Sequence, residues 1–464
     1  MIAPGLLLSL MPYVRLGHGL TLTGDPSLTM DLTADAADNA LVADWDISVV
    51  SSLQQALEAT VEYSGSSKST SVDDETLSAT ANDTSVIIIT AGADVNLTDD
   101  TIVKHGYSSN LWEASFWGMN AAVNVQNTSI SYITDINVTT HNGAANIYAY
   151  GSDTVVYVDG AWLYSSGPVA HGLYASGDGT IIATDVRHYS GGNRCSSFAG
   201  DSPAGYVTVE DSVAHTAGIG SAIFYALGEI TATNVTGWAE NSPILFMDGD
   251  QTATISDSTL YAGLLAGFVI FSSSERYSGA SLSISSSTIE LLNEDIPALW
   301  FGNVIADATL DDVTITTESG ILVVANYSQV TQDFDYYAGY DDNSALSPAE
   351  AYITVSDSTL TGDLVAYNES LISWSLTDSS SWTGTAYSGY DTYYIGVSLD
   401  STSTWTLTAD TCVYNFTDTD TSVTNVKSAG YTLTYDKSSS ANSWLDEKTI
   451  SLSGGGSLVP GTCN

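Results

Sequence analysis

The side chains best suited to acid–base chemistry are concentrated in one part of this sequence. Five of the six histidines lie between residues 105 and 215, and two of the few arginines lie among them. Imidazole and carboxylate groups exchange protons near neutral pH, and a guanidinium group binds a uronate or a sulfate. The candidate catalytic residues are His171, Arg187, His188, Arg194, Asp201, His215 and Asp248.

The spacing of these residues indicates how they could meet. His188 and His215 are 27 residues apart, close to one repeat of the chain, so we expect them to stack as neighbours on one face. Asp201 and Asp248 would form a paired-carboxylate site if both faced one groove. The alternative is that all of these are local turn and ion-pair residues in a very acidic protein.

Aromatic side chains form a second candidate set, for carbohydrate binding. The insertion at residues 326–351 interrupts the repeat and contains the run DFDYYAGYDD, which has no core to fill. Tyrosine and tryptophan rings present an apolar body and a polar tip to a sugar, whereas the alternative is ordinary packing. The candidate binding residues are Trp238, Tyr336, Tyr337 and Tyr340.

Distant residues can meet in this way only if the chain repeats regularly. A short alternating strand that ends in Asp or Asn recurs, and the first steps between these end residues are 26, 26, 23 and 23 residues. A near-constant period with strand and turn but no helical pattern predicts a parallel β-helix. The row of end residues is Asp159, Asp185, Asp211, Asn234, Asp257, Asp357, Asp378 and Asp400.

Each coil is predicted to contain two strands, because a strand that ends in Gly precedes each Asp-terminated strand. His171, Arg194 and Asp201 flank the turn at this Gly, where they could line a cleft for a carbohydrate. Apolar side chains on one side of each strand should stack into ladders. The residues expected to point inward are Val156, Ile182, Val207 and Ile230.

The chain divides into four expected segments. Residues 1–45 should be a signal or lead-in segment, and residues 46–85 an N-terminal cap and loop with a short helix at 51–63. The β-helix is predicted for residues 86–370. Residues 371–464 should form the final coils and a C-terminal cap. Three tryptophans are expected to cover those coils: Trp374, Trp382 and Trp405.

The row of Asp and Asn residues has two interpretations. Carboxylates one coil apart could share a calcium ion. Calcium is thus a possible cofactor, and no cofactor is required. The other interpretation is that Asp and Asn close a tight turn by bonding to their own backbone. We favour the turn, since each coil contributes a single such residue and the GGxGxD calcium repeat is missing. The sequence assigns no residue to a metal.

From about residue 86 to 450 the sequence resembles the right-handed parallel β-helix superfamily. The run NAAVNV at Asn120, the coil HTAGIGSAIFYALG and the closing coils with Trp after Ser or Thr are similar to secreted adhesin-like or autotransporter-passenger-like proteins. The resemblance implies an all-β fold made of a single right-handed solenoid. The superfamily also includes pectate lyases and polygalacturonases, so the fold leaves the activity open.

Charge and cysteine content limit the partners and the compartment. The formal charge is −45, from 9 Lys+Arg and 54 Asp+Glu, which excludes nucleic acid and anionic membranes as partners. No apolar run is long enough to span a membrane. Cys412 and Cys463 are expected to form a disulfide, which with eight Asn-x-Ser/Thr sequons indicates a secreted protein. Capped ends favour a monomer.

Two functions remain as expectations. The first is a secreted, adhesin-like or structural protein that binds a polysaccharide or cell-surface glycan. The alternative is a polysaccharide lyase or glycoside hydrolase that uses the region from His171 to Asp248. Substitution of His215 or Asp201 should abolish turnover in the enzyme, whereas Tyr336 or Tyr340 should matter in the binding protein.

Overall fold

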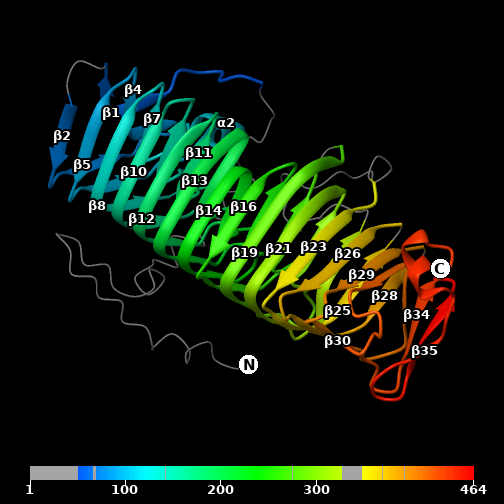
Figure 1. Ribbon diagram of the computed structural model, residues 1–464. Coiled ribbons are helices and arrows are strands. Elements are labelled where there is room, and N and C mark those ends of the chain that lie inside the picture. The colour runs from blue at the N-terminus through cyan, green and yellow to red at the C-terminus, as the bar shows by residue number, and fades with distance from the viewer. Residues whose placement is uncertain are drawn as a thin grey trace. The chain divides into compact units, whose positions relative to one another are not determined.

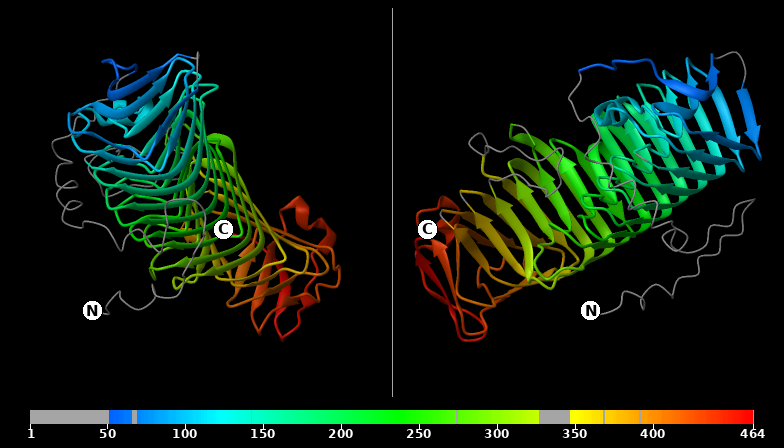
Figure 2. Two further views of the ribbon diagram at one scale, coloured as in Figure 1. Left: turned by 90° about the vertical axis from the view of Figure 1, so that its left-hand side faces the viewer. Right: turned by 180° about the vertical axis from the view of Figure 1, so that it is seen from behind.

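The computed structural model describes residues 51–65, 69–141, 143–273, 275–326, 347–367, 369–390 and 392–463. They form a parallel β-solenoid of about 15 turns, which confirms the predicted all-β, parallel β-helix fold. The chain divides into two compact units, unit 1 (Met1–Leu245) and unit 2 (Phe246–Asn464). Figures 1 and 2 show the strands lying side by side within each unit. No described helix has the length and apolar character needed to cross a membrane.

Each coil of unit 1 has three faces, although two strands per coil were predicted. The first face holds β1 (Glu58–Ser64), β4 (Thr84–Thr90), β7 (Val123–Gln126), β9 (Ile147–Tyr150), β11 (Leu173–Ser176) and the start of β13 (Phe198–Thr216) and β14 (Phe224–Ala239). Every one of these pairings is parallel, so equivalent residues of successive coils lie side by side.

The second and third faces of unit 1 share long strands. β2 (Ser69–Asp73) and β5 (Asp94–Thr98) lie on the second face, and β3 (Thr76–Ala79) and β6 (Thr101–Lys104) on the third. Four later strands, together with β14, bend through both faces without ending. They are β8 (Ile130–Thr140), β10 (Val155–Ser165), β12 (Gly179–Ser190) and β13.

Unit 2 repeats this plan. Its first face contains β18 (Phe268–Phe271), β20 (Leu299–Gly302), β22 (Ile321–Asn326), β25 (Asp363–Tyr367) and β28 (Ala386–Tyr390). Its second face contains β16 (Thr252–Ser256), parts of β19 (Tyr277–Leu291) and β21 (Val304–Thr316), β23 (Glu350–Ser356), β26 (Leu371–Thr377), β29 (Tyr394–Leu399) and β32 (Asn415–Asp418).

The third face and the C-terminal end complete unit 2. The third face contains β17 (Thr259–Ala262), the ends of β19 and β21, β24 (Thr359–Thr361), β27 (Ser381–Thr383), β30 (Thr404–Thr406) and β33 (Val426–Lys427). A small sheet follows, formed by β31 (Thr411–Val413), β34 (Thr432–Asp436), β36 (Ser457–Gly461) and β35 (Ile450–Ser451), with the 3-10 helix η4 (Ser440–Leu445). β15 (Leu245–Asp248) spans the boundary between the units.

Most residues of the Asp and Asn row lie at the corner between the second and third faces, as the turn interpretation predicts. Asp185, Asp211 and Asn234 have φ between 50 and 54°, the left-handed region that a corner requires and that Asp and Asn tolerate best. Asp159 is an exception, because Gly160 occupies the corner with φ of 79°. Asp400 instead accepts the backbone N–H groups of the turn that follows it, including that of Ser403 at 2.7 Å.

Inward side chains form the predicted ladders, with one correction. Val156, Val207 and Ile230 are fully buried and lie in register with Ile181 between them. Ile182 was expected to point inward, but 40% of it is exposed. Successive residues of a strand point to opposite sides, so Ile181 takes the interior position and places Ile182 outside.

A short helix lies near the N-terminus, but not where the sequence placed it. Residues 58–63 of the expected helix belong instead to the strand β1, which pairs with β4. Glu58–Ser64 alternates exposed and half-buried residues, the pattern of a strand. The helix is α2 (Leu111–Trp117), capped by the Asn110 side chain and by Gly118 with φ of 67°.

The three tryptophans of the closing coils lie inside the solenoid, whereas a covering position was expected. Trp374, Trp382 and Trp405 are fully buried, and the rings of the last two stack with their centroids 4.7 Å apart. Each follows or precedes outward Thr or Ser residues in its strand, so alternation directs it inward. The predicted disulfide between Cys412 and Cys463 is confirmed, with the two Cα atoms 5.6 Å apart.

Candidate functional site

Two buried tyrosines on the outer side of the first face form the centre of a polar cluster in unit 1. Tyr148 of β9 and Tyr174 of β11 stand one coil apart, with ring centroids 4.9 Å apart. The hydroxyl of Tyr148 donates to the carbonyl of Ser115 in α2 at 2.6 Å, and that of Tyr174 donates to the Asp201 carboxylate. Burial raises the pKa of both phenols well above 10, so each remains a hydrogen-bond donor.

His171 belongs to the same cluster. Its ring lies against Tyr174 with centroids 4.2 Å apart, and its Nδ1 accepts the backbone N–H of Ser196 at 3.0 Å. Burial lowers the pKa of His171 to about 3, helped by the positive charge of Arg194. The structure therefore places His171 and Asp201 against Tyr174, with the charge of Arg194 acting on His171. A neutral imidazole with its acceptor nitrogen occupied is a packing and hydrogen-bonding group here.

His188 and His215 do not stack, contrary to the prediction. His188 pairs with Ala214, while His215 pairs with Tyr189, so the two histidines are one residue out of register and point to opposite sides of the sheet. His188 is fully buried between the hydroxyls of Ser165 and Ser197, and burial lowers its pKa to about 3.

His215 points outward instead and contacts an acid and an aromatic ring. Its Nε2 lies 2.7 Å from a carboxylate oxygen of Glu240, and its ring centroid is 6.0 Å from that of Trp238. Trp238 is half-buried on the outer side of β14, so it is the one described residue of the predicted aromatic set. Tyr336, Tyr337 and Tyr340 lie outside the described residues.

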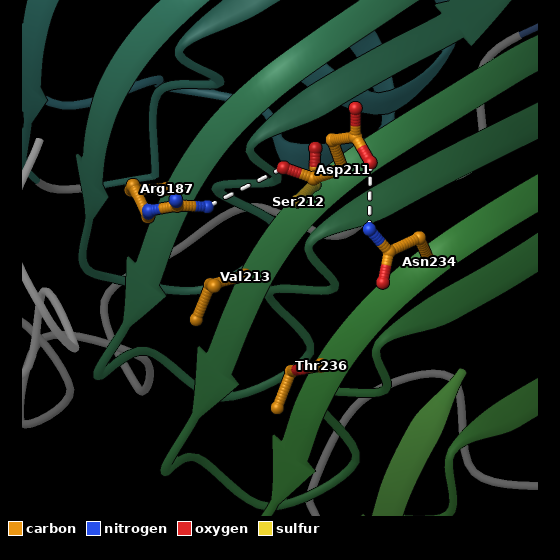
Figure 3. A pocket seen from close by; sticks show the side chains of 6 residues that line it. All are labelled: Arg187, Asp211, Ser212, Val213, Asn234 and Thr236. Atoms are coloured by element: carbon orange, nitrogen blue, oxygen red, sulfur yellow. Dashed lines mark hydrogen bonds between the residues drawn. The ribbon is translucent and has the colours of Figure 1, made fainter. Parts of the chain in front are cut away.

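Arg187 lines a small hollow at the corner between the second and third faces. Its guanidinium lies 3.3 Å from the Asp185 carboxylate and 3.5 Å from the carbonyl oxygen of Asp211 (Figure 3). Asn234 donates to the Asp211 carboxylate at 2.6 Å across the same hollow. The volume, about 20 Å³, has room for one water molecule and not for a sugar ring.

Asp201 and Asp248 lie in different units, and each already has a local partner. Asp201 accepts from Tyr174 and from the backbone N–H of Ser202, the latter at 2.7 Å. Asp248 accepts the backbone N–H of Ser273 at 2.7 Å, and burial raises its pKa. The paired-carboxylate site of Asp201 and Asp248 stays a prediction.

Exposed aromatic side chains gather instead on the second face of unit 1. Tyr132 and Tyr157 are 45% and 38% exposed, and their rings stack with centroids 5.0 Å apart and planes 7° from parallel. On the next coil, Ile182 pairs with Tyr157 and continues the row. On the coil after that, the residue that pairs with Ile182 is Thr208, and the exposed Tyr206 lies two residues before Thr208. We call these four residues, three tyrosines and one isoleucine, the aromatic row.

Sequence reasoning missed the aromatic row and the buried tyrosine pair, although both have a sequence signal. Tyr132 and Tyr157 hold the same place in the alternating runs ISYIT and VVYVD, and Tyr148 and Tyr174 hold the same place in IYAYG and LYASG. Comparing equivalent outward positions of successive coils would have found both pairs.

The donor sets do not favour a resident metal among the described residues. No group of three or more His, Cys, Asp or Glu side chains there could hold a metal ion. Comparison with known proteins found no matching family model, no matching curated protein and no matching solved structure.

Proposed function

We propose that this chain is an extracellular protein that binds a neutral polysaccharide along the second face of unit 1. The observation that carries the proposal is the aromatic row, in which Tyr132 and Tyr157 are stacked and exposed on neighbouring coils. Exposed large apolar side chains in a contiguous row mark an interaction surface more often than single ones do. A phenol offers a sugar both apolar ring area and a hydroxyl group.

The repeat of the solenoid supports a polymeric ligand. Parallel strands lie about 4.8 Å apart, so the row presents one contact group per coil along a line. An extended polysaccharide advances by a similar distance per sugar. A chain lying along the row would therefore place successive sugars over Tyr132, Tyr157 and Ile182, and the weak contacts would add.

Charge favours a neutral polymer over a uronate or sulfated one. The net charge of −45 repels a polyanion, and Asp159 and Glu210 flank the row on the same face. Arg187, the cation expected to bind an acidic sugar, is only 4% exposed and is paired with Asp185. The described strand segments of this face contain no Lys or Arg that would compensate the charge of an anionic polysaccharide.

The chemistry of the histidine region does not support the enzyme alternative. His171, His188 and Asp201 are buried and hydrogen-bonded to neighbouring coils, and both histidines have a pKa near 3. A general acid or base needs a pKa near the working pH and a path to the substrate. The disulfide between Cys412 and Cys463 supports an extracellular location, because such bonds persist in oxidising compartments.

Binding isotherms on insoluble neutral polysaccharides test this proposal. Chitin, cellulose and mixed-linkage β-glucan would be compared with polygalacturonate, and released sugars would be measured in the same tubes. We expect retention on at least one neutral polymer without release. The double variant Tyr132→Ala/Tyr157→Ala should bind about thirtyfold more weakly, since two ring contacts at about 1 kcal/mol each make about 2 kcal/mol.

Tyr431 provides the matched control, because it is 39% exposed and lies in unit 2. Tyr431→Ala should bind like the parent protein. Equal losses in both variants would mean that tyrosines act non-specifically. Release of sugars that survives the double variant would favour the enzyme alternative instead.

A further inference from the structure

We propose that the third face of unit 2 is an ice-binding surface, independent of the glycan-binding face. Four successive coils place a hydroxyl residue, a buried apolar residue and a second hydroxyl residue on this face. The tripeptides are Thr-Ile-Thr at the end of β21, Thr-Leu-Thr in β24, Ser-Trp-Thr in β27 and Thr-Trp-Thr in β30. We call their eight outward residues the hydroxyl plate. The strand β30, which carries the last tripeptide, is labelled in Figure 1.

The register places the plate residues on a regular grid. Thr359 pairs with Ser381, which pairs with Thr404, and no register shift interrupts these pairings. At the first coil, the backbone N–H of Val313 donates to the Ser358 hydroxyl at 2.9 Å, which sets Thr314 beside Thr359. The grid therefore repeats about every 4.8 Å across coils and about every 6.6 Å along each strand.

The middle residue of each tripeptide anchors the plate from inside. Leu360, Trp382 and Trp405 are at most 1% exposed, and the two indole rings stack. Each indole N–H donates to a backbone carbonyl of the neighbouring coil, that of Trp382 to Gly362 at 2.7 Å. Rings fixed in this way hold the backbone, and with it the outward threonines, in one arrangement.

The plate carries no charge, although the protein has a formal net charge of −45. The chain has 54 Asp and Glu residues, yet all eight plate positions are Thr or Ser. Acidic residues stand at the border of the plate, as in the corner residues Asp312 and Asp357. Carboxylates would organise water around themselves, whereas a neutral plate leaves the water between the hydroxyls free to follow the grid.

Ice is the ligand that fits a neutral lattice of this kind. The γ-methyl of each threonine orders the water beside it, and the hydroxyl hydrogen-bonds that water. Both repeats lie close to the spacing between oxygen atoms on a prism face of hexagonal ice. Water ordered over the plate therefore matches the lattice in two dimensions, which lets the protein adsorb to a growing crystal.

Ice adsorption of the full chain tests the inference. Thermal hysteresis would be measured, and the fluorescently labelled protein would be frozen slowly to see whether it enters the ice. We expect measurable hysteresis and incorporation for the parent protein. The double variant Thr361→Tyr/Thr383→Tyr should lose both, because two bulky rings lift the lattice away from the plate.

Thr354→Tyr is the matched control, since Thr354 is exposed in β23 on the second face of the same coil and lies near charged Asp307 and Asp311. It should retain full ice activity, and circular dichroism should show all variants folded. Exclusion of the parent protein from ice would overturn the inference. So would equal activity of the plate variant, or loss in the Thr354 variant alone.

Discussion

Lowering the pH should weaken unit 1 through its two buried histidines. His171 and His188 have folded-state pKa values of about 3, because burial disfavours the charged imidazolium, whereas an unfolded histidine has a pKa near 6.5. A lowered folded pKa means that the unfolded state takes up protons first as the pH falls. Stability is thus fully present above pH 6.5 and is lost progressively between pH 6.5 and about 3.

The size of the effect follows from the pKa values. A pH of 5 lies about 1.5 units below the pKa of an unfolded histidine. Each of those units stabilises the protonated, unfolded state by about 1.4 kcal/mol. Each buried histidine therefore removes about 2 kcal/mol from the free energy of unfolding between pH 7.5 and pH 5. The pair removes about 4 kcal/mol, a large share of the stability of a typical domain.

Denaturant unfolding at pH 7.5 and pH 5 would measure this loss. His188→Asn removes one titrating group but keeps a side chain that can bond the hydroxyls of Ser165 and Ser197. Its loss between the two pH values should be about 2 kcal/mol smaller than that of the parent. Leu163→Met, at the buried position beside His188, is the control and should keep the parent's pH dependence. Identical pH dependence in His188→Asn and the parent would refute the reasoning.

Three further predictions concern unit 2. Trp382→Ala should lower the free energy of unfolding by about 3–5 kcal/mol, measured by denaturant titration, because it empties a fully buried site. Cys412→Ser/Cys463→Ser should cost about 4 kcal/mol, since the disulfide spans 51 residues, and reductant should then no longer shift the melting temperature. Asp418 has a pKa raised to about 6 by burial, so it should contribute more stability as the pH falls from about 6 to about 4. The gain would be measured as stronger protection of β32 from amide hydrogen exchange at pH 4 than at pH 6, and Asp418→Asn should abolish it. The same pH dependence in the variant and the parent protein would contradict the raised pKa of Asp418.

The repeat was predictable because it depends on local chemistry. Asp185, Asp211 and Asn234 mark a corner that needs a left-handed backbone, and few residue types accept one. The third face was missed for a related reason. The strands pass through that corner without ending, so a turn residue was taken for the end of a strand.

The direction of individual side chains was harder to predict. A shift of one residue along a strand reverses the face, which explains the errors at Ile182 and at the pair of His188 and His215. Spacing by one coil length is therefore insufficient, and the exact pairing register is needed. The helix expected at 51–63 failed because an amphipathic run of this length also fits a half-buried strand.

The most direct test of polysaccharide binding is hydroxyl-radical footprinting with soluble oligosaccharides of the polymer that retains the protein. Oxidation of each tyrosine would be measured with and without the oligosaccharide. The proposal predicts protection of Tyr132 and Tyr157 that grows with oligosaccharide length, and unchanged oxidation of Tyr431. Saturating ligand that leaves Tyr132 and Tyr157 fully reactive, or protects Tyr431 equally, would contradict it.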